Sequence, residues 1–145
     1  MGDKPVSVEE DEFPRVADLT QDLAYYFVDR TTVKQAVPLT TVYKEVYGEI
    51  YASCFHKDWV RMYVLKRAII SCRRSMRPFI VPVEIKGRTQ YFVPTKRKDM
   101  EHYVEILKKA QAGIGDTLAV KIPRWLKEHK AILELIRMER DEKKV

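Results

Sequence analysis

The stretch KDWVRMYVLKRAIISCRRSMRPFIVPVEIKGRTQYFVPTKRK, residues 57–98, decides the fold of this 145-residue chain. Its first half has a helical period over residues 59–77, and a proline follows directly. In its second half, β-branched and aromatic residues flank Lys86-Gly87-Arg88. This composition predicts a β-hairpin over residues 79–94. Because Pro82 has no backbone N–H, we expect it on an edge strand or at a bulge.

The helix predicted over residues 59–77 has two contrasting faces. Asp58 is the expected N-cap, and the helix should end before Pro78. On a helical wheel the face expected to meet the core holds Val64, Leu65, Ala68, Ile69, Cys72 and Met76. The opposite face holds five cations together with Tyr63 and Ile70, and the cations are Lys66, Arg67, Arg73, Arg74 and Arg77.

The charge of the chain is concentrated in this central stretch. Residues 57–98 carry twelve basic and two acidic side chains, a net charge of +10. Residues 1–37 carry −4, residues 38–56 carry −1 and residues 99–145 carry +1, and the whole chain has a net charge of +6. The sign of the central stretch indicates an anionic partner, either nucleic acid or an acidic protein.

Outward from the centre, the pattern is mostly helical. Apolar spacing predicts helices over 17–29 and 39–53, and tyrosines at 43, 47 and 51 form a second stripe along the latter. On the C-terminal side we expect a helix from Thr95 that Gly113 and Gly115 end, and then a short strand over 117–122. A last helix should begin with Pro123 and extend to about residue 140. Its core stripe consists of Trp125, His129, Ile132, Leu133 and Ile136.

The predicted fold class is therefore α+β and mainly helical, a four- to five-helix bundle with an inserted β-hairpin. Residues 15–145 should form a single domain with its basic helix–hairpin unit at 57–98. The acidic residues 1–14 should form a mobile tail. No apolar run approaches the roughly 20 residues that cross a bilayer, and the N-terminal residues lack the apolar core of a signal peptide. We expect a cytoplasmic protein without membrane contact.

Cysteine and amide content bear on the source and on the redox state. The chain has no asparagine and four glutamines, a bias typical of hyperthermophile proteins. Two cysteines cannot form the disulfide framework of a small secreted domain. We interpret Cys54 and Cys72 as two buried thiols. A hyperthermophile source would also permit a disulfide between them, and the sequence leaves this question open.

The sequence predicts no cofactor, no metal site, no small-molecule substrate and no enzymatic activity. Cys54, His56 and Cys72 lack the paired spacing of a zinc site. Glycines at 113 and 115 match neither nucleotide-binding fingerprint. The run Glu84-Ile85-Lys86 resembles the E-x-K strand of restriction-type nucleases, which requires a second acidic residue on a neighbouring strand. Glu84 is the only acidic residue between Asp58 and Asp99, so a metal cage would lack ligands.

One binding hypothesis is direct DNA recognition. Helix, basic helix and hairpin follow one another in the order of a winged helix, with residues 39–53, 59–77 and 79–94 in these roles. The basic helix would contact phosphates or guanine edges, and the hairpin tip would follow the neighbouring backbone. The candidate contact residues are Arg61, Lys66, Arg67, Arg73, Arg74, Arg77, Lys86, Arg88, Lys96, Arg97 and Lys98.

A second DNA-binding pattern lies further along the chain. The run TLAVKIPRWL at 117–126 resembles the strand and first helix of a ribbon-helix-helix repressor. The chain ends before the second helix that those repressors require, which counts against this interpretation.

The other binding hypothesis is an acidic protein partner, recognised by charge complementarity. Tyrosine and arginine are frequent hot-spot residues in protein interfaces, and four tyrosines lie in or near the basic stretch: Tyr43, Tyr47, Tyr51 and Tyr63. Large parts of the surface of RNA polymerase are acidic, so a compact basic protein could dock there. Filling of an amphipathic core is the alternative explanation for these tyrosines.

In layout and composition, the chain resembles the small regulators encoded by crenarchaeal viruses, a group that includes inhibitors of RNA polymerase. The features that carry this resemblance are the basic stretch 57–98, the hairpin 79–94 and the helices around them. The resemblance covers most of the chain and transfers no individual residue. It implies a non-enzymatic protein of the host cytoplasm or the virion. Such a protein would occupy the DNA-binding channel of multisubunit RNA polymerase and inhibit transcription. Polymerase binding is thus the first functional hypothesis, and a winged-helix-like DNA-binding protein is the alternative.

Overall fold

A computed structural model describes residues 16–110 and 117–143 of the chain. The tail expected at 1–14 and the glycines expected to end a helix at 113 and 115 lie outside the described residues. Within them, helices predominate and three strands form one antiparallel sheet. The prediction of a mainly helical α+β fold is confirmed.

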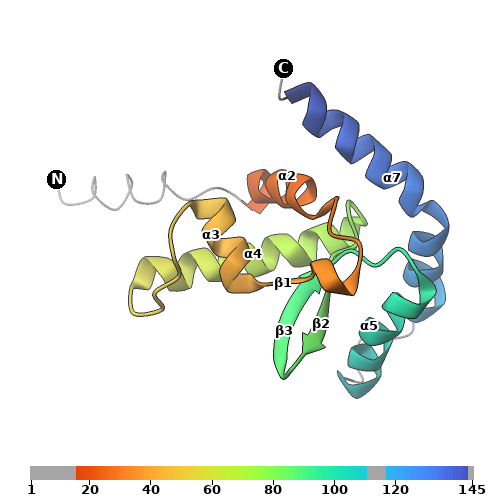
Figure 1. The fold of residues 1–145 in the computed structure, drawn as a ribbon, viewed down its shortest axis with the longest axis horizontal. Coiled ribbons are helices and arrows are strands. Elements are labelled where there is room, and N and C mark those ends of the chain that lie inside the picture. Colours follow the sequence, from red (N-terminus) through yellow and green to blue (C-terminus); the bar gives the residue numbers. More distant parts are fainter. Residues whose placement is uncertain (1–15, 111–116, 144–145) are drawn as a thin grey trace.

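The first six main elements follow the order helix, strand, helix, helix, strand, strand (Figure 1). They are α2 (Val16–Phe27), β1 (Val37–Pro38), α3 (Leu39–Tyr47), α4 (His56–Ser75), β2 (Val81–Ile85) and β3 (Arg88–Phe92), with a 3-10 turn η1 (Val33–Gln35) before β1. The remaining elements are α5 (Arg97–Ala110), η2 (Thr117–Lys121) and α7 (Ile122–Lys143). In Figure 1, α2, α3 and α4 gather beside the sheet, and α7 extends away from the rest of the fold towards the C-terminus.

The sheet confirms the predicted hairpin and adds a strand. β2 and β3 pair antiparallel, and the turn between them consists of Lys86 and Gly87, whose φ angles are 53° and 78°. A two-residue turn with two positive φ angles matches the right-handed twist of the strands that it joins. The strand order is β1-β3-β2, so Pro82 lies on an edge strand, as predicted. The two-residue strand β1 pairs with β3 and was not predicted.

Helix α3 is shorter than the helix predicted over residues 39–53. It ends at Gly48, which adopts the left-handed conformation with φ of 71° and so terminates the helical hydrogen bonds. Ile50, which the sequence placed on an apolar helical stripe, is 77% exposed. Tyr51 returns to the core side, and its ring centroid lies 5.4 Å from that of Tyr43.

The predicted N-cap role of Asp58 is wrong. Helix α4 begins at His56, and Asp58 is a buried residue of its first turn. The Asp58 carboxylate accepts hydrogen bonds from the Tyr43 hydroxyl at 2.6 Å and from the Ala52 amide at 3.0 Å. The Tyr43 hydrogen bond holds the pKa of Asp58 below its ordinary value. Asp58 therefore joins α3, the following loop and α4 instead of capping a helix.

The apolar face of α4 packs on α2 and the sheet, as its period predicted. Leu65, Ala68, Ile69 and Cys72 are buried, and the helix ends at Ser75, before Met76 in the left-handed conformation. Val64 and Met76 are only half-buried.

The expectation of two buried thiols is half wrong. Burial raises the pKa of the Cys72 thiol to about 12, whereas Cys54 lies exposed in the loop before α4. Both cysteines are free, so they form no disulfide with each other.

The segment predicted as a strand at 117–122 is instead helical. It forms the π-helical turn η2, which continues directly into α7. Leu118 is half-buried while Ala119 and Val120 are both exposed, so the apolar alternation has no core to face. The ribbon-helix-helix interpretation is therefore wrong, because it required a strand in this segment. The last helix starts as expected and extends three residues beyond the predicted end.

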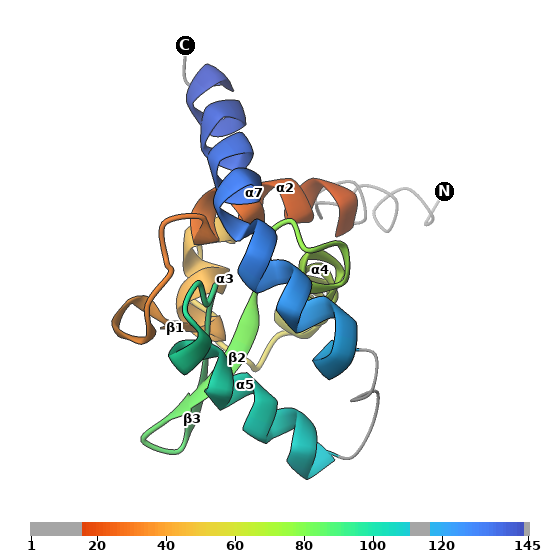
Figure 2. The ribbon, with the colours of Figure 1, turned by 90° about the vertical axis from the view of Figure 1, so that its right-hand side faces the viewer.

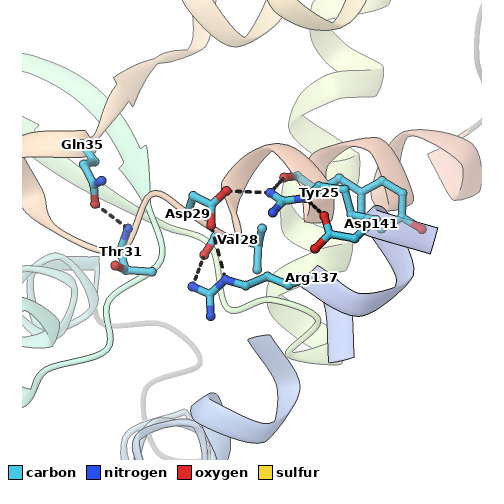
Figure 3. Close-up of polar contacts among 8 residues, drawn as sticks. Tyr25, Val28, Asp29, Thr31, Gln35, Arg137 and Asp141 are labelled. Atoms are coloured by element: carbon cyan, nitrogen blue, oxygen red, sulfur yellow. Dashed lines mark hydrogen bonds and ion pairs between the residues drawn. The ribbon is translucent and has the colours of Figure 1, made fainter. Parts of the chain in front are cut away.

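Helix α7 is attached to the fold at two places. Near its start, the buried Trp125 donates a hydrogen bond through Nε1 to the carbonyl of Pro94 at 2.6 Å and stacks on Phe79. Near its end, Asp29 accepts ion pairs from Arg140 at 2.6 Å and from Arg137 at 3.3 Å (Figure 3). The two arginines also donate to backbone carbonyls at the end of α2.

Candidate nucleic-acid interface

Three of the eleven cations predicted as contact residues hold the fold together. The Arg61 guanidinium pairs with Glu49 at 2.7 Å and lies over the Tyr47 ring. Arg73 donates through Nε to the carbonyl of Ile80 at 2.7 Å and lies over the Tyr103 ring. Arg77 pairs with Glu139 of α7 through both carboxylate oxygens, at 3.0 and 3.2 Å. These contacts anchor all three side chains to the fold, and Arg61 and Arg77 are paired with carboxylates.

Three other predicted cations lie together on the exposed face of α4. Lys66, Arg67 and Arg74 are exposed and form no ion pair with any residue that the structure describes. Two aromatic side chains and an isoleucine share this face at helical spacing. We call this surface the α4 stripe, and it consists of Trp59, Tyr63, Lys66, Arg67, Ile70 and Arg74.

The two aromatic rings of the α4 stripe are both 60% exposed, and each has a polar contact. Trp59 donates through Nε1 to the carbonyl of Ser53 at 2.6 Å, which ties its ring to the loop before α4. Arg67 donates to the Tyr63 hydroxyl at 3.3 Å, and its guanidinium lies 5.7 Å from the centre of that ring. The aromatic end of the α4 stripe is thus oriented by contacts within the protein.

A hollow of about 320 Å³ adjoins the other end of the α4 stripe. Ile70 and Arg74 of the stripe line it together with Thr117 and Lys121 of η2. Its other lining residues are Arg73, Phe79 and Tyr103. A hollow lined by three cations, Arg73, Arg74 and Lys121, and by the Thr117 side chain suits an anionic oxygen group such as a phosphate.

The remaining five predicted cations lie elsewhere. Lys86 and Arg88 are exposed at the hairpin, which extends away from α4 in both Figure 1 and Figure 2. Lys96, Arg97 and Lys98 are exposed at the start of α5. Lys98 lines a hollow whose walls also carry Glu84, Glu101 and Glu105, so local carboxylates offset its charge. The hairpin pair, by contrast, faces solvent beside no described carboxylate partner.

Two features of this surface were missed from the sequence. Trp59 was read only as the start of the helix, although its spacing of four residues from Tyr63 places both rings on one face. Lys121 joins the hollow from a segment 47 positions after Arg74 along the chain. No local pattern could have indicated that contact, because tertiary packing alone brings η2 beside α4.

Within the described residues, no group of three or more histidine, cysteine, aspartate or glutamate side chains is arranged to hold a metal ion. Cys54 is exposed in the loop before α4, while Cys72 is buried under α2, with its sulfur 3.5 Å from the Thr20 carbonyl oxygen. Glu84 is exposed on β2. The three candidate metal ligands and the E-x-K pattern are therefore not assembled into a site in this part of the chain.

No protein-family model matches the chain, and no curated protein or solved structure matches it significantly. None of the helices at 16–110 and 117–143 combines the length and apolar composition needed to cross a bilayer. Function is therefore inferred from the residues and geometry described above.

Proposed function

We propose that this chain is a non-enzymatic DNA-binding protein of the winged-helix type, which lays the α4 stripe against DNA. The observation that carries the proposal is that Lys66, Arg67 and Arg74 lie on one face of α4 and form no ion pair with the residues at 16–110 and 117–143. An exposed row of cations without carboxylate partners favours binding to phosphates, because counterions leave the DNA when it is neutralised.

The topology supports the same proposal. The order helix, strand, helix, helix, strand, strand, with a sheet ordered β1-β3-β2, is the arrangement of a winged helix. In that arrangement the helix before the hairpin is the recognition helix, and here this helix is α4. Lys86 and Arg88 then occupy the wing, where they can reach the DNA backbone beside the recognition helix.

Binding to RNA polymerase stays a prediction. An acidic protein channel would attract the same cations, so the α4 stripe does not discriminate between the two partners. Strand β1 and the sheet order favour the DNA-binding proposal. The sequence indicated only a helix, a basic helix and a hairpin, and β1 adds a further element of the winged-helix arrangement.

Charge reversal tests the proposal with a matched control. In the test variant, Lys66, Arg67 and Arg74 are all changed to Glu. In the control, three exposed cations on other elements, Lys34, Lys127 and Lys130, are changed to Glu, which alters the net charge equally. Fluorescence anisotropy with a labelled duplex measures the affinity at several salt concentrations.

We expect the test variant to lose roughly 100-fold or more in affinity at low salt and the control roughly 3-fold. The slope of log affinity against log salt should fall by about 2 to 3 units in the test variant. Equal losses in both variants would contradict the proposal. If the wild-type chain binds no DNA but retains purified multisubunit RNA polymerase after nuclease treatment, the polymerase hypothesis replaces it.

A further inference from the structure

The aromatic end of the α4 stripe is unusual beside the rest of the protein. The chain has two tryptophans, and Trp125 is completely buried whereas Trp59 is 60% exposed. Tyr63, one turn further along α4, is also 60% exposed. Single exposed apolar residues are common on protein surfaces. Two aromatic rings at a spacing of four residues, followed on the same face by cations, form a continuous surface of the kind that binds a ligand.

Both rings are held in place before any ligand arrives. The hydrogen bond from Trp59 Nε1 to the Ser53 carbonyl satisfies the only polar atom of the indole. Ser53 itself has a positive φ of 61°. The Tyr63 hydroxyl accepts from Arg67. The Trp59 ring therefore presents apolar surface to solvent, Tyr63 is held by Arg67, and little side-chain freedom is lost when a flat partner stacks on them.

The cations specify what kind of flat partner fits. Lys66 and Arg67 lie within one turn of Tyr63, and Arg74 lies two turns further along the same face. Aromatic rings next to a row of cations are the combination that proteins use to bind single-stranded nucleic acid, because bases stack on the rings while the cations neutralise the backbone. In a duplex the base faces are covered by neighbouring base pairs, so they cannot stack on a side chain.

We propose that Trp59 and Tyr63 stack on unpaired bases, so that the chain binds single-stranded DNA, or duplex DNA with an unpaired segment, more tightly than fully paired DNA. This inference rests on the proposed DNA-binding function and names its substrate. The bases lie over the two rings, and the phosphates follow Lys66, Arg67 and Arg74 towards the hollow that Lys121 completes.

The difference between the two tryptophans supplies a direct signal. Because Trp125 is buried and Trp59 exposed, a base stacked on Trp59 should quench the long-wavelength part of the emission and leave the rest unchanged. The protein is titrated with an oligothymidine strand of about 20 nucleotides and separately with a blunt duplex of the same length. We expect quenching with the single strand and almost none with the duplex.

Variants separate stacking from charge. Tyr63→Ala should weaken single-strand binding roughly 5- to 100-fold, while Tyr63→Phe should stay within about 3-fold of the wild type. For Tyr63→Ala, duplex affinity should fall less than single-strand affinity, because paired bases have no free face to stack on the ring. Trp59→Phe should retain binding but abolish the quenching, and circular-dichroism melting checks that each variant is folded.

The outcomes distinguish this inference from the function on which it rests. If duplex binding depends on the three cations but Tyr63→Ala leaves single-strand binding unchanged, the stacking inference is wrong and the DNA-binding proposal stands. If the wild type binds neither form of DNA, both are wrong.

Discussion

Arginines have opposite roles at the α2–α7 contact and on the α4 stripe. At the α2–α7 contact, Arg137 and Arg140 both pair with Asp29 and donate to carbonyls of the chain (Figure 3). On the α4 stripe, Arg67 and Arg74 are exposed and meet no carboxylate among the residues that the structure describes. The comparison teaches that the number of cations in a segment does not mark a binding surface. The proposed surface differs in that the cations of one continuous face have no carboxylate partner among the described residues.

The neighbours Arg73 and Arg74 give the sharpest form of this comparison. Arg73→Ala removes the hydrogen bond to the Ile80 carbonyl and the contact with the Tyr103 ring, so we expect a loss of roughly 1.5 to 3 kcal/mol in unfolding free energy. Arg74→Ala should change stability by less than about 0.5 kcal/mol. It should instead lower DNA affinity roughly 3- to 10-fold at low salt.

Urea denaturation and fluorescence anisotropy measure the two effects on the same protein samples. An Arg73→Ala variant as stable as the wild type would contradict the comparison, because the contacts of Arg73 with Ile80 and Tyr103 would then not stabilise the fold. Arg73→Lys serves as the control for charge alone, since it keeps a cation but cannot reproduce the guanidinium geometry.

A smaller effect is expected at the base of α4, where the buried Asp58 carboxylate accepts from Tyr43. Tyr43→Phe should lower the unfolding free energy by about 1 to 2 kcal/mol at pH 7, because the carboxylate loses a donor. The hydrogen bond depresses the pKa of Asp58, so its contribution is complete above the ordinary aspartate pKa of 3.8. That contribution is lost as the pH falls through the lower pKa of the folded state.

The difference between wild type and Tyr43→Phe should therefore shrink below about pH 4, as measured by urea denaturation at several pH values. Tyr47→Phe is a suitable control, because the Tyr47 hydroxyl donates to the neutral carbonyl of Arg61 and not to a carboxylate. A difference that stays constant with pH would mean that Asp58 is not the group stabilised by Tyr43.

The smallest effect is expected at the α2–α7 contact. Partial burial raises the pKa of Asp29, but hydrogen bonds from Arg140 and Arg137 outweigh it and hold the pKa below its ordinary value. Asp29 is more than half exposed, so the ion pairs should contribute only about 0.5 to 1 kcal/mol. Asp29→Asn should lower the melting temperature slightly at neutral pH and leave DNA affinity unchanged.

This small loss should disappear as the pH falls through the lowered pKa of Asp29, since the wild-type carboxyl is then neutral as well. Differential scanning calorimetry at neutral and acidic pH measures this change in melting temperature. Glu134→Gln on α7 is the control, because it breaks no ion pair of the described residues. Reduced DNA binding by Asp29→Asn would place the α2–α7 contact at the interface and so contradict the comparison.

Local sequence signals predicted most elements but not all of their ends. The hairpin was predictable because a glycine between two runs of β-branched and aromatic residues leaves few alternatives. Helix α3 was predicted too long, because an apolar period continues past Gly48 even though its left-handed backbone ends the helix. The alternating apolar residues at 117–122 are compatible with a strand and also with an exposed helical turn. Val120 is exposed and faces no core, and this is known only from the structure.

The candidate interface was predictable as a region but not as a surface. The sequence indicated eleven cations over 61–98, yet Arg61, Arg73 and Arg77 have partners at Glu49, Ile80 and Glu139 that no local pattern reveals. Trp59 was overlooked, because whether an aromatic ring on a helix is buried depends on what packs beside it.

By itself, the sequence determined the helical periods, the hairpin and the concentration of positive charge in residues 57–98, because these depend on side chains close together in the chain. Tertiary structure alone decided which cations are neutralised, which aromatic rings face solvent and which segment completes the hollow beside Arg74. The physical reason is that a charge or an apolar ring is stabilised by whatever lies within a few ångströms of it. For Arg77 and Glu139, separated by 62 positions in the chain, only folding brings the two together.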